Sequence, residues 1–316
     1  MSQQISRRKV LRLFGVSAAA AMLPRVGRSI AIATPQSPPS SFTYCLNMAT
    51  IRGHNLGFVK ELEIASKAGF RSVEIWMDTL QTYVTKGGTL YDIKTRLNDL
   101  GLQAENCIGF AEWIVDDAAK RQQGMEQLKK EMDLLAKIGC KRIAAPPVGA
   151  TDIPGLDLKK AAARYRAILE LGDATGVVPQ LEMWGFSKNL SRVSEVLYVA
   201  MESGHPSAKV LLDVFHLYKG GSPLDTLSMM RPSATDILHV NDYPAHLSPD
   251  AITDADRIYP GDGVAPLKRI LQTLHKPDKP LIISTEVFNK NYYSQDALVV
   301  AKTAMSKMKS VTSGIA

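Results

Sequence analysis

Cysteine is scarce in this chain. Its 316 residues include three cysteines, and no two of them form a CxxC pair, which argues against a disulfide framework. Cys45 and Cys107 fall in predicted strands, and Cys140 falls at a helix-to-strand turn. We therefore expect all three to be buried as small apolar side chains. An odd number of cysteines leaves at least one thiol free.

A glycine-rich phosphate loop is also missing. After the first predicted strand, residues 47–54 read Asn-Met-Ala-Thr-Ile-Arg-Gly-His, which matches neither GxGxxG nor GxxxxGK[ST]. A doubly wound open sheet usually carries such a loop at this place. Its absence makes the doubly wound sheet the weaker alternative for the fold.

Apolar runs long enough to span a bilayer are absent as well. The alanine-rich run from Leu13 to Leu23 is too short for that purpose. It follows the paired residues Arg7 and Arg8 and precedes a small-residue cleavage site at 31–33. This layout predicts a twin-arginine signal peptide over residues 1–33. We expect a periplasmic or otherwise exported protein with no membrane span after signal removal; the alternative is a disordered basic N-terminus.

Positive charge is concentrated in the predicted signal peptide. The whole chain has a net charge of +7, and residues 1–33 contain six basic and no acidic residues. The remaining chain therefore carries a net charge of +1. A nearly neutral mature protein gives no indication of a nucleic-acid partner.

Short apolar runs alternate with amphipathic stretches along the rest of the chain, after a Pro- and Ser-rich tether at 34–41. Eight of these runs read as buried strands. They cover residues 42–48, 72–76, 103–108, 142–146, 178–184, 209–217, 236–240 and 280–287.

Helix-like segments separate the predicted strands. They lie near residues 57–69, 89–100, 117–138, 157–175, 190–203, 223–230 and 264–275, with a last one at 295–310. Glycines at 69, 101, 139 and 176 follow four of them, as helix C-caps do. Eight strand–helix units in about 280 residues predict a single (β/α)8 TIM barrel over residues 42–316.

Four polar residues stand near the ends of the last four predicted strands. They are Glu182, Asp213, His239 and Glu286. A charged side chain in a buried strand costs free energy unless something pairs with it. Because the carboxyl ends of barrel strands converge on one mouth, we expect these four side chains to meet there. Each residue alone has a structural explanation, such as an ion pair, a helix cap or a buried core histidine.

Three carboxylates and one imidazole suit a hard divalent cation. We predict one Mn²⁺, with Mg²⁺ or Co²⁺ as alternatives, because oxygen-rich ligation does not favour structural zinc. Such an ion can polarise a carbonyl and stabilise an enediolate. Glu182 and Glu286 then form the natural pair to remove and return a proton.

Other polar and aromatic residues near the predicted mouth are candidates to bind the substrate. His216 follows Asp213 by three residues, so the strand must end between them if both side chains are to face the mouth. Arg257, in the loop after the seventh strand, can bind a substrate oxygen or remain solvated. Trp184 can form an apolar wall or simply pack. Glu74 and His54 are weaker candidates, with structural or surface roles as their alternatives.

Six short motifs carry a resemblance to a known family. They lie at 73–76, 181–184, 212–216, 239–242, 256–263 and 285–289. In these motifs the chain resembles the sugar phosphate isomerase/epimerase family, within the xylose isomerase-like TIM barrels. The resemblance covers nearly the whole mature chain and is strongest from 178 to 290.

The resemblance implies roles for the residues already singled out. In that family the four strand-end residues bind Mn²⁺ or a similar ion. In its ketose 3-epimerases the two glutamates also act as acid and base, and residues at the positions of His216 and Arg257 contact the substrate. Ketose 3-epimerases of the family carry a further Glu where this chain has Lys188, a departure from the strict 3-epimerase pattern.

We therefore expect a metal-dependent isomerase or epimerase that moves a proton next to the carbonyl of a small keto sugar. The alternative is a lyase or dehydratase that acts on a keto sugar, an inosose or a 3-keto-glycoside. An apurinic-site endonuclease would need three metals and more than the six histidines present. A non-catalytic sugar-binding protein is the remaining hypothesis.

Overall fold

The strands of this protein form one sheet. The structure is a computed structural model that describes residues 42–275 and 279–315; the predicted signal peptide at 1–33 and the tether at 34–41 lie outside the described residues. The eight strands in the described part are β1 Phe42–Asn47, β2 Ser72–Trp76, β3 Gln103–Ile108, β4 Arg142–Ala145, β5 Val178–Glu182, β6 Val210–Asp213, β7 Ile237–Val240 and β8 Leu281–Thr285.

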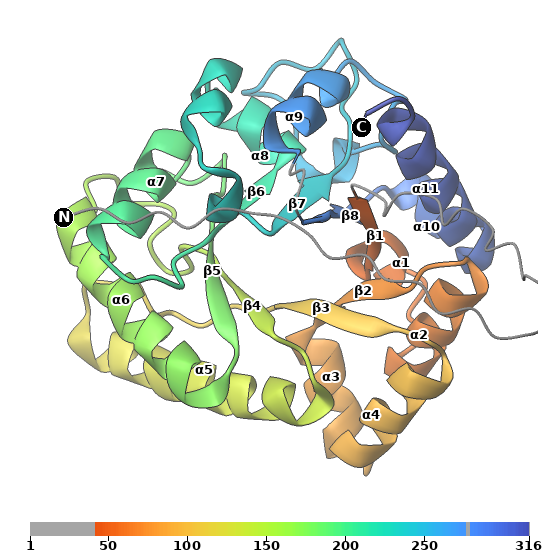
Figure 1. Cartoon of the computed structure of the whole chain (residues 1–316), viewed down its shortest axis with the longest axis horizontal. Helices are drawn as coiled ribbons and strands as arrows, with labels where there is room; N and C mark the ends of the chain where they lie inside the picture. The colour runs from red at the N-terminus through yellow and green to blue at the C-terminus, as the bar shows by residue number, and fades with distance from the viewer. Residues whose placement is uncertain (1–41, 276–278, 316) are drawn as a thin grey trace, which may run out of the picture. The chain divides into compact units, whose positions relative to one another are not determined.

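The strand order shows how the sheet closes. The paired strands are parallel and follow the order β3-β2-β1-β8-β7-β6-β5-β4. β3 and β4, at the two ends of this order, also contact each other. The sheet therefore curves into a barrel, and the ribbon shows the strands surrounded by helices (Figure 1). The predicted TIM barrel is confirmed.

Helices connect the strands and cover the outside of the barrel (Figure 1). The α-helices are α1 Ala49–Arg52, α2 Phe58–Lys67, α3 Met77–Thr85, α4 Leu90–Asp99, α5 Ala118–Ile138, α6 Leu158–Thr175, α7 Val193–Glu202, α8 Val214–Lys219, α9 Leu267–Leu274, α10 Lys290–Tyr293 and α11 Ala297–Thr312. Three 3-10 helices are η1 Leu224–Met229, η2 Pro232–Ala234 and η3 Asp254–Asp256. The predicted helix near 223–230 is thus a 3-10 helix. None of the described helices is long and apolar enough to cross a membrane.

The two longest helices show the local signals that set their ends. α5 begins after Asp117 and α6 after Asp157, and each carboxylate accepts hydrogen bonds from two backbone N–H groups of the first turn. Gly139 and Gly176 end these helices at φ values of 85° and 74°. A residue without a Cβ adopts this left-handed conformation at little cost, which explains the predicted C-caps.

One predicted strand is too long. The apolar run at 209–217 was assigned to a single strand, but β6 ends at Asp213 and α8 begins at Val214. The Asp213 Oδ1 atom caps this helix by accepting a hydrogen bond from the backbone N–H of His216 at 3.1 Å. The turn expected between Asp213 and His216 is therefore present, and both side chains are buried at the same end of the barrel.

The barrel has an apolar interior below its mouth. A small cluster, separate from the main core between strands and helices, takes one residue from each of six strands: Cys45, Ile108, Ala144, Leu211, Ile237 and Ile282. All three cysteines are buried and free, as predicted. This packed interior supports the polar residues at the strand ends from below.

Candidate active site

A pocket opens at the carboxyl ends of the strands. Its volume is about 390 Å³, within the range of roughly 300–1,000 Å³ typical of small-molecule sites. The polar residues that line it are Glu182, His216, Asp254, Arg257 and Glu286. Four of these five are at most 5% exposed, Asp254 being the exception. Burial of so much charge in one place indicates a functional site.

Three of the four predicted metal ligands form a tight group. One ligand atom each from Asp213, His239 and Glu286 lies within 4.8 Å of the others. The Nδ1 atom of His239 is 3.6 Å from Asp213 Oδ2 and 3.3 Å from Glu286 Oε2. This buried nitrogen has no hydrogen-bond partner among the described residues. Two carboxylate oxygens and an unpartnered ring nitrogen that face one point fit a divalent cation.

Glu74 lies behind His239 and does not line the pocket. Its carboxylate is 3.0 Å from His239 Nε2 and accepts hydrogen bonds from Asn47 and Asn106 at 3.2 and 2.8 Å. These contacts fix the orientation of the imidazole and turn Nδ1 toward the other two ligands. The sequence left Glu74 open between a substrate contact and a structural role, and the geometry gives it a positioning contact with His239.

Charge around His239 alters its protonation. Burial alone would lower the pKa of His239, but the carboxylates of Glu74 and Glu286 raise it well above its usual value. A cation that binds Nδ1 must therefore displace a proton from the ring.

Glu182 stands apart from the group of three. It lines the pocket at 4% exposure, and its Oε2 atom has no hydrogen-bond partner among the described residues. Burial raises the pKa of Glu182 to about 8; His239 opposes this rise and the nearby Glu286 adds to it. A carboxyl group in this environment holds its proton at neutral pH.

Arg257 lies at the centre of the charged residues. Its Nη1 atom donates to Asp213 Oδ2 at 2.9 Å and to Glu286 Oε2 at 2.7 Å, and its Nη2 atom donates to Asp254 at 2.5 Å. Burial would raise the pKa of Asp213, but the guanidinium holds it well below its usual range. Arg257 thereby keeps Asp213 ionised, as a metal ligand must be.

His216 faces the pocket next to Arg257. Its Nε2 atom is 3.4 Å from Arg257 Nη2, and its Nδ1 atom is buried without a hydrogen-bond partner among the described residues. Burial lowers the pKa of His216 to about 4, although the carboxylate of Asp213 opposes this shift. A neutral imidazole with an unpartnered nitrogen is suited to bind a hydroxyl group.

Aromatic rings also line the pocket. Trp184 lies 5.2 Å from Phe186 and 6.3 Å from Phe110, measured between ring centroids. Trp76 lies 5.5 Å from Phe110 and 6.1 Å from Phe288. The pocket therefore combines charged and aromatic side chains, which suits a ligand with both hydroxyl groups and C–H faces.

Several residues considered from the sequence do not line this pocket: Glu74, Asp213 and His239 are absent from its lining, and so is His54. The two ring nitrogens of His54 lie within hydrogen-bond distance of backbone carbonyls: Nδ1 is 2.9 Å from that of Ile51, and Nε2 is 2.9 Å from that of Gln295. Lys188, at the position of the additional family glutamate, is also absent from the lining. The sequence reasoning missed Asn47 and Asp254. Asn47 ends the first strand, a position that could have revealed it, whereas Asp254 begins the three-residue 3-10 helix η3, which is too short to give a periodic signal.

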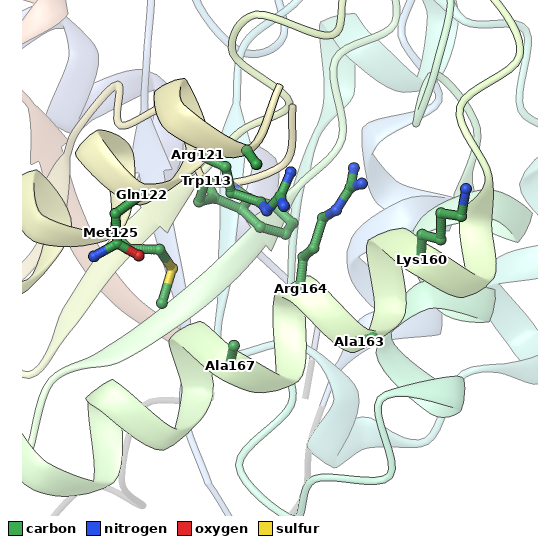
Figure 2. Close-up of a pocket in the computed structure, with 9 residues that line it drawn as sticks. Trp113, Arg121, Gln122, Met125, Lys160, Ala163, Arg164 and Ala167 are labelled. Atoms are coloured by element: carbon green, nitrogen blue, oxygen red, sulfur yellow. The ribbon is translucent and has the colours of Figure 1, made fainter. Parts of the chain in front are cut away.

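A second, larger hollow lies between α5 and α6, with a volume of about 520 Å³. Figure 2 shows its lining, in which Arg121, Lys160 and Arg164 are the charged residues and no carboxylate takes part. Arg121 and Arg164 donate to the backbone carbonyls of Val115 and Ile114. The residues that line this hollow include no carboxylate and no histidine, so its greater size does not make it the better candidate.

A family model decides where this chain belongs. The model of the xylose isomerase-like TIM barrel matches residues 62–311. The chain belongs to this family. A protein of Halalkalibacterium halodurans named inosose isomerase is 28% identical over 278 residues, which cover 85% of this chain and 96% of that protein. A Bacillus velezensis protein of the same name is 27% identical, and the match again covers 85% of this chain and 96% of that protein.

Solved structures share the fold of this family member. The IOLI protein, crystallised with a zinc atom, superposes with a TM-score of 0.78 at 22% identity and covers 87% of this chain and 99% of its own. L-ribulose 3-epimerase superposes with a TM-score of 0.68 at 18% identity and covers 85% of this chain and 94% of its own. The probable 3-DHS dehydratase AsbF of Bacillus anthracis superposes with a TM-score of 0.70 at 19% identity and covers 85% of this chain and 99% of its own. At these identities the likeness establishes the fold.

Proposed function

We propose that this protein is a divalent-metal-dependent isomerase or epimerase that moves a proton next to the carbonyl of a small keto sugar or inosose. The observation that carries the proposal is the convergence of Asp213, His239 and Glu286 on one point beside the proton-holding carboxyl group of Glu182. The inosose isomerases, similar over nearly their whole length, support the substrate class.

Asp213, His239 and Glu286 would hold the cation. The sequence predicts Glu182 as a fourth ligand, but in this proposal Glu182 keeps its proton and serves as the acid. When bound, the cation supplies Lewis acidity that polarises a carbonyl and makes the neighbouring C–H more acidic. Manganese is our preferred ion because most of these ligands are oxygen atoms.

We assign the two glutamates opposite roles in proton transfer. Glu286 accepts hydrogen bonds from Arg257 at 2.7 Å and Asn47 at 2.9 Å, which orient its carboxylate to take a proton from the substrate. Glu182 holds a proton through burial and can deliver it to the enediolate. The two residues line the same pocket, so one substrate can reach both.

The remaining pocket residues bind and orient the substrate. His216 offers an unpartnered ring nitrogen to a hydroxyl group. Arg257, already directed at the carboxylates, can bind an oxygen that gains negative charge. The rings of Trp184 and Trp76 cover the C–H face of a sugar and exclude water from the site of proton transfer.

A dehydratase or lyase is the second candidate. Glu182 is an acid inside the pocket, and the same enediolate can expel a hydroxyl or glycosidic oxygen that Glu182 protonates. Lys188, in place of the glutamate of ketose 3-epimerases, also weakens the strict epimerase assignment. AsbF, a probable 3-DHS dehydratase, shares this fold and supports the second candidate.

One experiment separates these functions. The Mn²⁺-loaded protein would be incubated in D₂O with inososes, ketoses and 3-keto-glycosides, and the products followed by NMR. Deuterium at the carbon next to the carbonyl, with no loss of water or glycone, supports the isomerase. Release of water or glycone supports the lyase. Binding without any deuterium incorporation across the panel contradicts both enzymes and favours a sugar-binding protein.

We also propose that the protein is exported through the twin-arginine pathway, on the evidence of the first 33 residues. Replacing Arg7 and Arg8 with lysine should leave the protein in the cytoplasmic fraction of the producing cell. Unchanged export of this double variant would contradict the proposal.

A further inference from the structure

Arg257 binds the two carboxylate oxygens that face His239. Its Nη1 atom is 2.9 Å from Asp213 Oδ2 and 2.7 Å from Glu286 Oε2. The same two oxygens lie 3.6 and 3.3 Å from the Nδ1 atom of His239. A positive side chain is therefore bonded to two of the three atoms that make up the candidate cation site.

The other oxygens of these carboxylates have different partners. Asp213 Oδ1 accepts hydrogen bonds from the backbone N–H of His216 and from Asn241, both at 3.1 Å. Glu286 Oε1 accepts a hydrogen bond from Asn47 at 2.9 Å. Although Asn241 also reaches Asp213 Oδ2 at 3.2 Å, Oδ2 and Oε2 are the oxygens that both carboxylates direct to the centre. A cation and Arg257 thus need the same two atoms.

The guanidinium has a second anchor at the edge of the pocket. Its Nη2 atom donates to Asp254 Oδ1 at 2.5 Å, and the Asp254 side chain is 48% exposed. The guanidinium carbon lies 4.3 Å from the ring centroid of Phe215 and 5.1 Å from that of Phe288. Nη1 can therefore leave the two carboxylates while Nη2 keeps a charged partner and the rings keep their cation–π contacts.

We propose that Arg257 competes with the divalent cation for Asp213 Oδ2 and Glu286 Oε2, and thereby sets the cation affinity of the site. This inference rests on the proposed metal-dependent function. Two positive groups that share two oxygens in a buried site repel each other strongly. Cation binding therefore moves the guanidinium toward Asp254, where it meets the substrate. Arg257 acts here as a positioning residue that links cation loading to substrate binding.

The first test measures cation affinity after the charge of Arg257 is removed. Arg257→Met keeps much of the side-chain length and apolar contact. We expect it to bind Mn²⁺ about tenfold more tightly than wild type, comparable in size to the effect of other partners of metal ligands. Isothermal titration calorimetry and competition with a fluorescent chelator would give the dissociation constants.

The chain offers a matched control for this variant. Arg52 also stacks on a pocket-wall ring, 4.0 Å from the Trp76 centroid, and pairs with a rim carboxylate, Asp78, at 2.8 Å. It makes no hydrogen bond to Asp213 or Glu286 among the described residues. Arg52→Met should therefore change the Mn²⁺ dissociation constant much less than Arg257→Met does.

A second variant, with the opposite expected effect on Mn²⁺ affinity, tests the proposal even if Arg257→Met does not fold. Asp254→Asn weakens the second anchor, so Arg257 should hold the two carboxylates more firmly and Mn²⁺ should bind more weakly than in wild type. Asp78→Asn, which removes a similar charge beside Arg52, is the control and should have a smaller effect.

The outcomes separate this inference from the function on which it rests. Tighter binding by Arg257→Met and weaker binding by Asp254→Asn support competition. If wild type binds Mn²⁺ and Arg257→Met binds it with the same or lower affinity, the competition is overturned and the metal-dependent function stands. Failure of all these proteins to bind Mn²⁺ overturns both.

Discussion

Arginines in two hollows of this barrel bind different kinds of partner. In the hollow between α5 and α6 (Figure 2), Arg164 and Arg121 donate to the backbone carbonyls of Ile114 and Val115 at 2.5 and 2.7 Å, and Arg164 also pairs with the exposed carboxylate of Asp116. In the pocket at the strand ends, Arg257 donates to two buried carboxylates instead. The first two arginines hold the segment before α5 in place. Arg257 instead neutralises buried carboxylates that the barrel does not need in order to fold.

The difference shows which observation identifies the active site. Backbone carbonyls must find donors wherever the chain is buried, so arginines that satisfy them have a structural explanation. Buried carboxylates cost free energy and are kept where chemistry needs them. The hollow between α5 and α6 has the larger volume, about 520 Å³ against about 390 Å³. The groups that the arginines bind therefore identify the candidate site, whereas the volume of the hollow does not.

The most severe test removes a central carboxylate. Asp213→Ala should weaken Mn²⁺ binding by more than the roughly 10–100-fold lost when an outer partner of a ligand is removed. Turnover should disappear with the cation. Metal analysis of the purified variant and titration calorimetry would measure the loss. Normal metal content and activity in this variant would place the cation elsewhere.

Removing the proton of Glu182 should affect chemistry more than cation binding. Glu182→Gln is expected to lower turnover by about 10²–10⁴-fold, the usual contribution of a general acid. Mn²⁺ affinity should fall less than in Asp213→Ala, because Glu182 lies outside the group of three. Turnover and affinity measured on the same preparation would compare the two losses.

Folding stability provides the control for that variant. With a folded pKa of about 8 against an ordinary value of 4.5, Glu182 ionises first in the unfolded chain. It therefore destabilises the fold as the pH rises between these values. The metal-free Glu182→Gln protein should match wild type at pH 4 and become relatively more stable toward pH 8. Thermal unfolding of a less stable variant at pH 8 would contradict the assignment.

Cation binding should tighten as the pH rises. The pKa of His239 is raised well above its usual value because, despite burial, Glu74 and Glu286 favour the charged ring. Displacing one proton from Nδ1 makes the apparent affinity rise by up to about tenfold per pH unit below that pKa. Titrations from pH 6 to pH 8 would check this slope. A pH-independent affinity would mean that His239 does not lose a proton to the cation.

We expect the smallest effect on Mn²⁺ binding from a substitution in the hollow between α5 and α6. Arg164→Met removes a hydrogen bond to the Ile114 carbonyl and an ion pair with the exposed Asp116, from a side chain that is 14% exposed. The variant should lose about 1.5–3 kcal/mol of unfolding free energy, the range for a hydrogen bond to a charged group, because the exposed ion pair adds little. Its Mn²⁺ affinity should equal that of wild type. Urea unfolding and calorimetry would test both statements.

The barrel and most of its elements could be predicted because their signals are local. Strand runs, helix caps such as Asp157 and end glycines such as Gly176 are encoded within a few residues. The boundary after Asp213 was misjudged because Val214, Phe215 and Leu217 continue the apolar run on the buried side of a short helix. An uninterrupted apolar run does not distinguish strand from helix.

The site was predictable only in part, because some of its contacts depend on pairings far apart in the sequence. Strand ends pointed to Asp213, His239 and Glu286, since parallel strands bring their carboxyl ends together. The contact of Glu74 with His239 depends on strands β2 and β7 facing each other across the barrel, which no local pattern encodes. The bonds of Arg257 to two carboxylates depend on the path of a loop. Such contacts require the folded structure.

The most direct test is a crystal structure of the Mn²⁺-loaded protein with anomalous data collected at the manganese edge. We expect a single strong anomalous peak, with Asp213 Oδ2, His239 Nδ1 and Glu286 Oε2 within about 2–2.5 Å of the ion. A peak at another place, or none at full Mn²⁺ saturation, would contradict it.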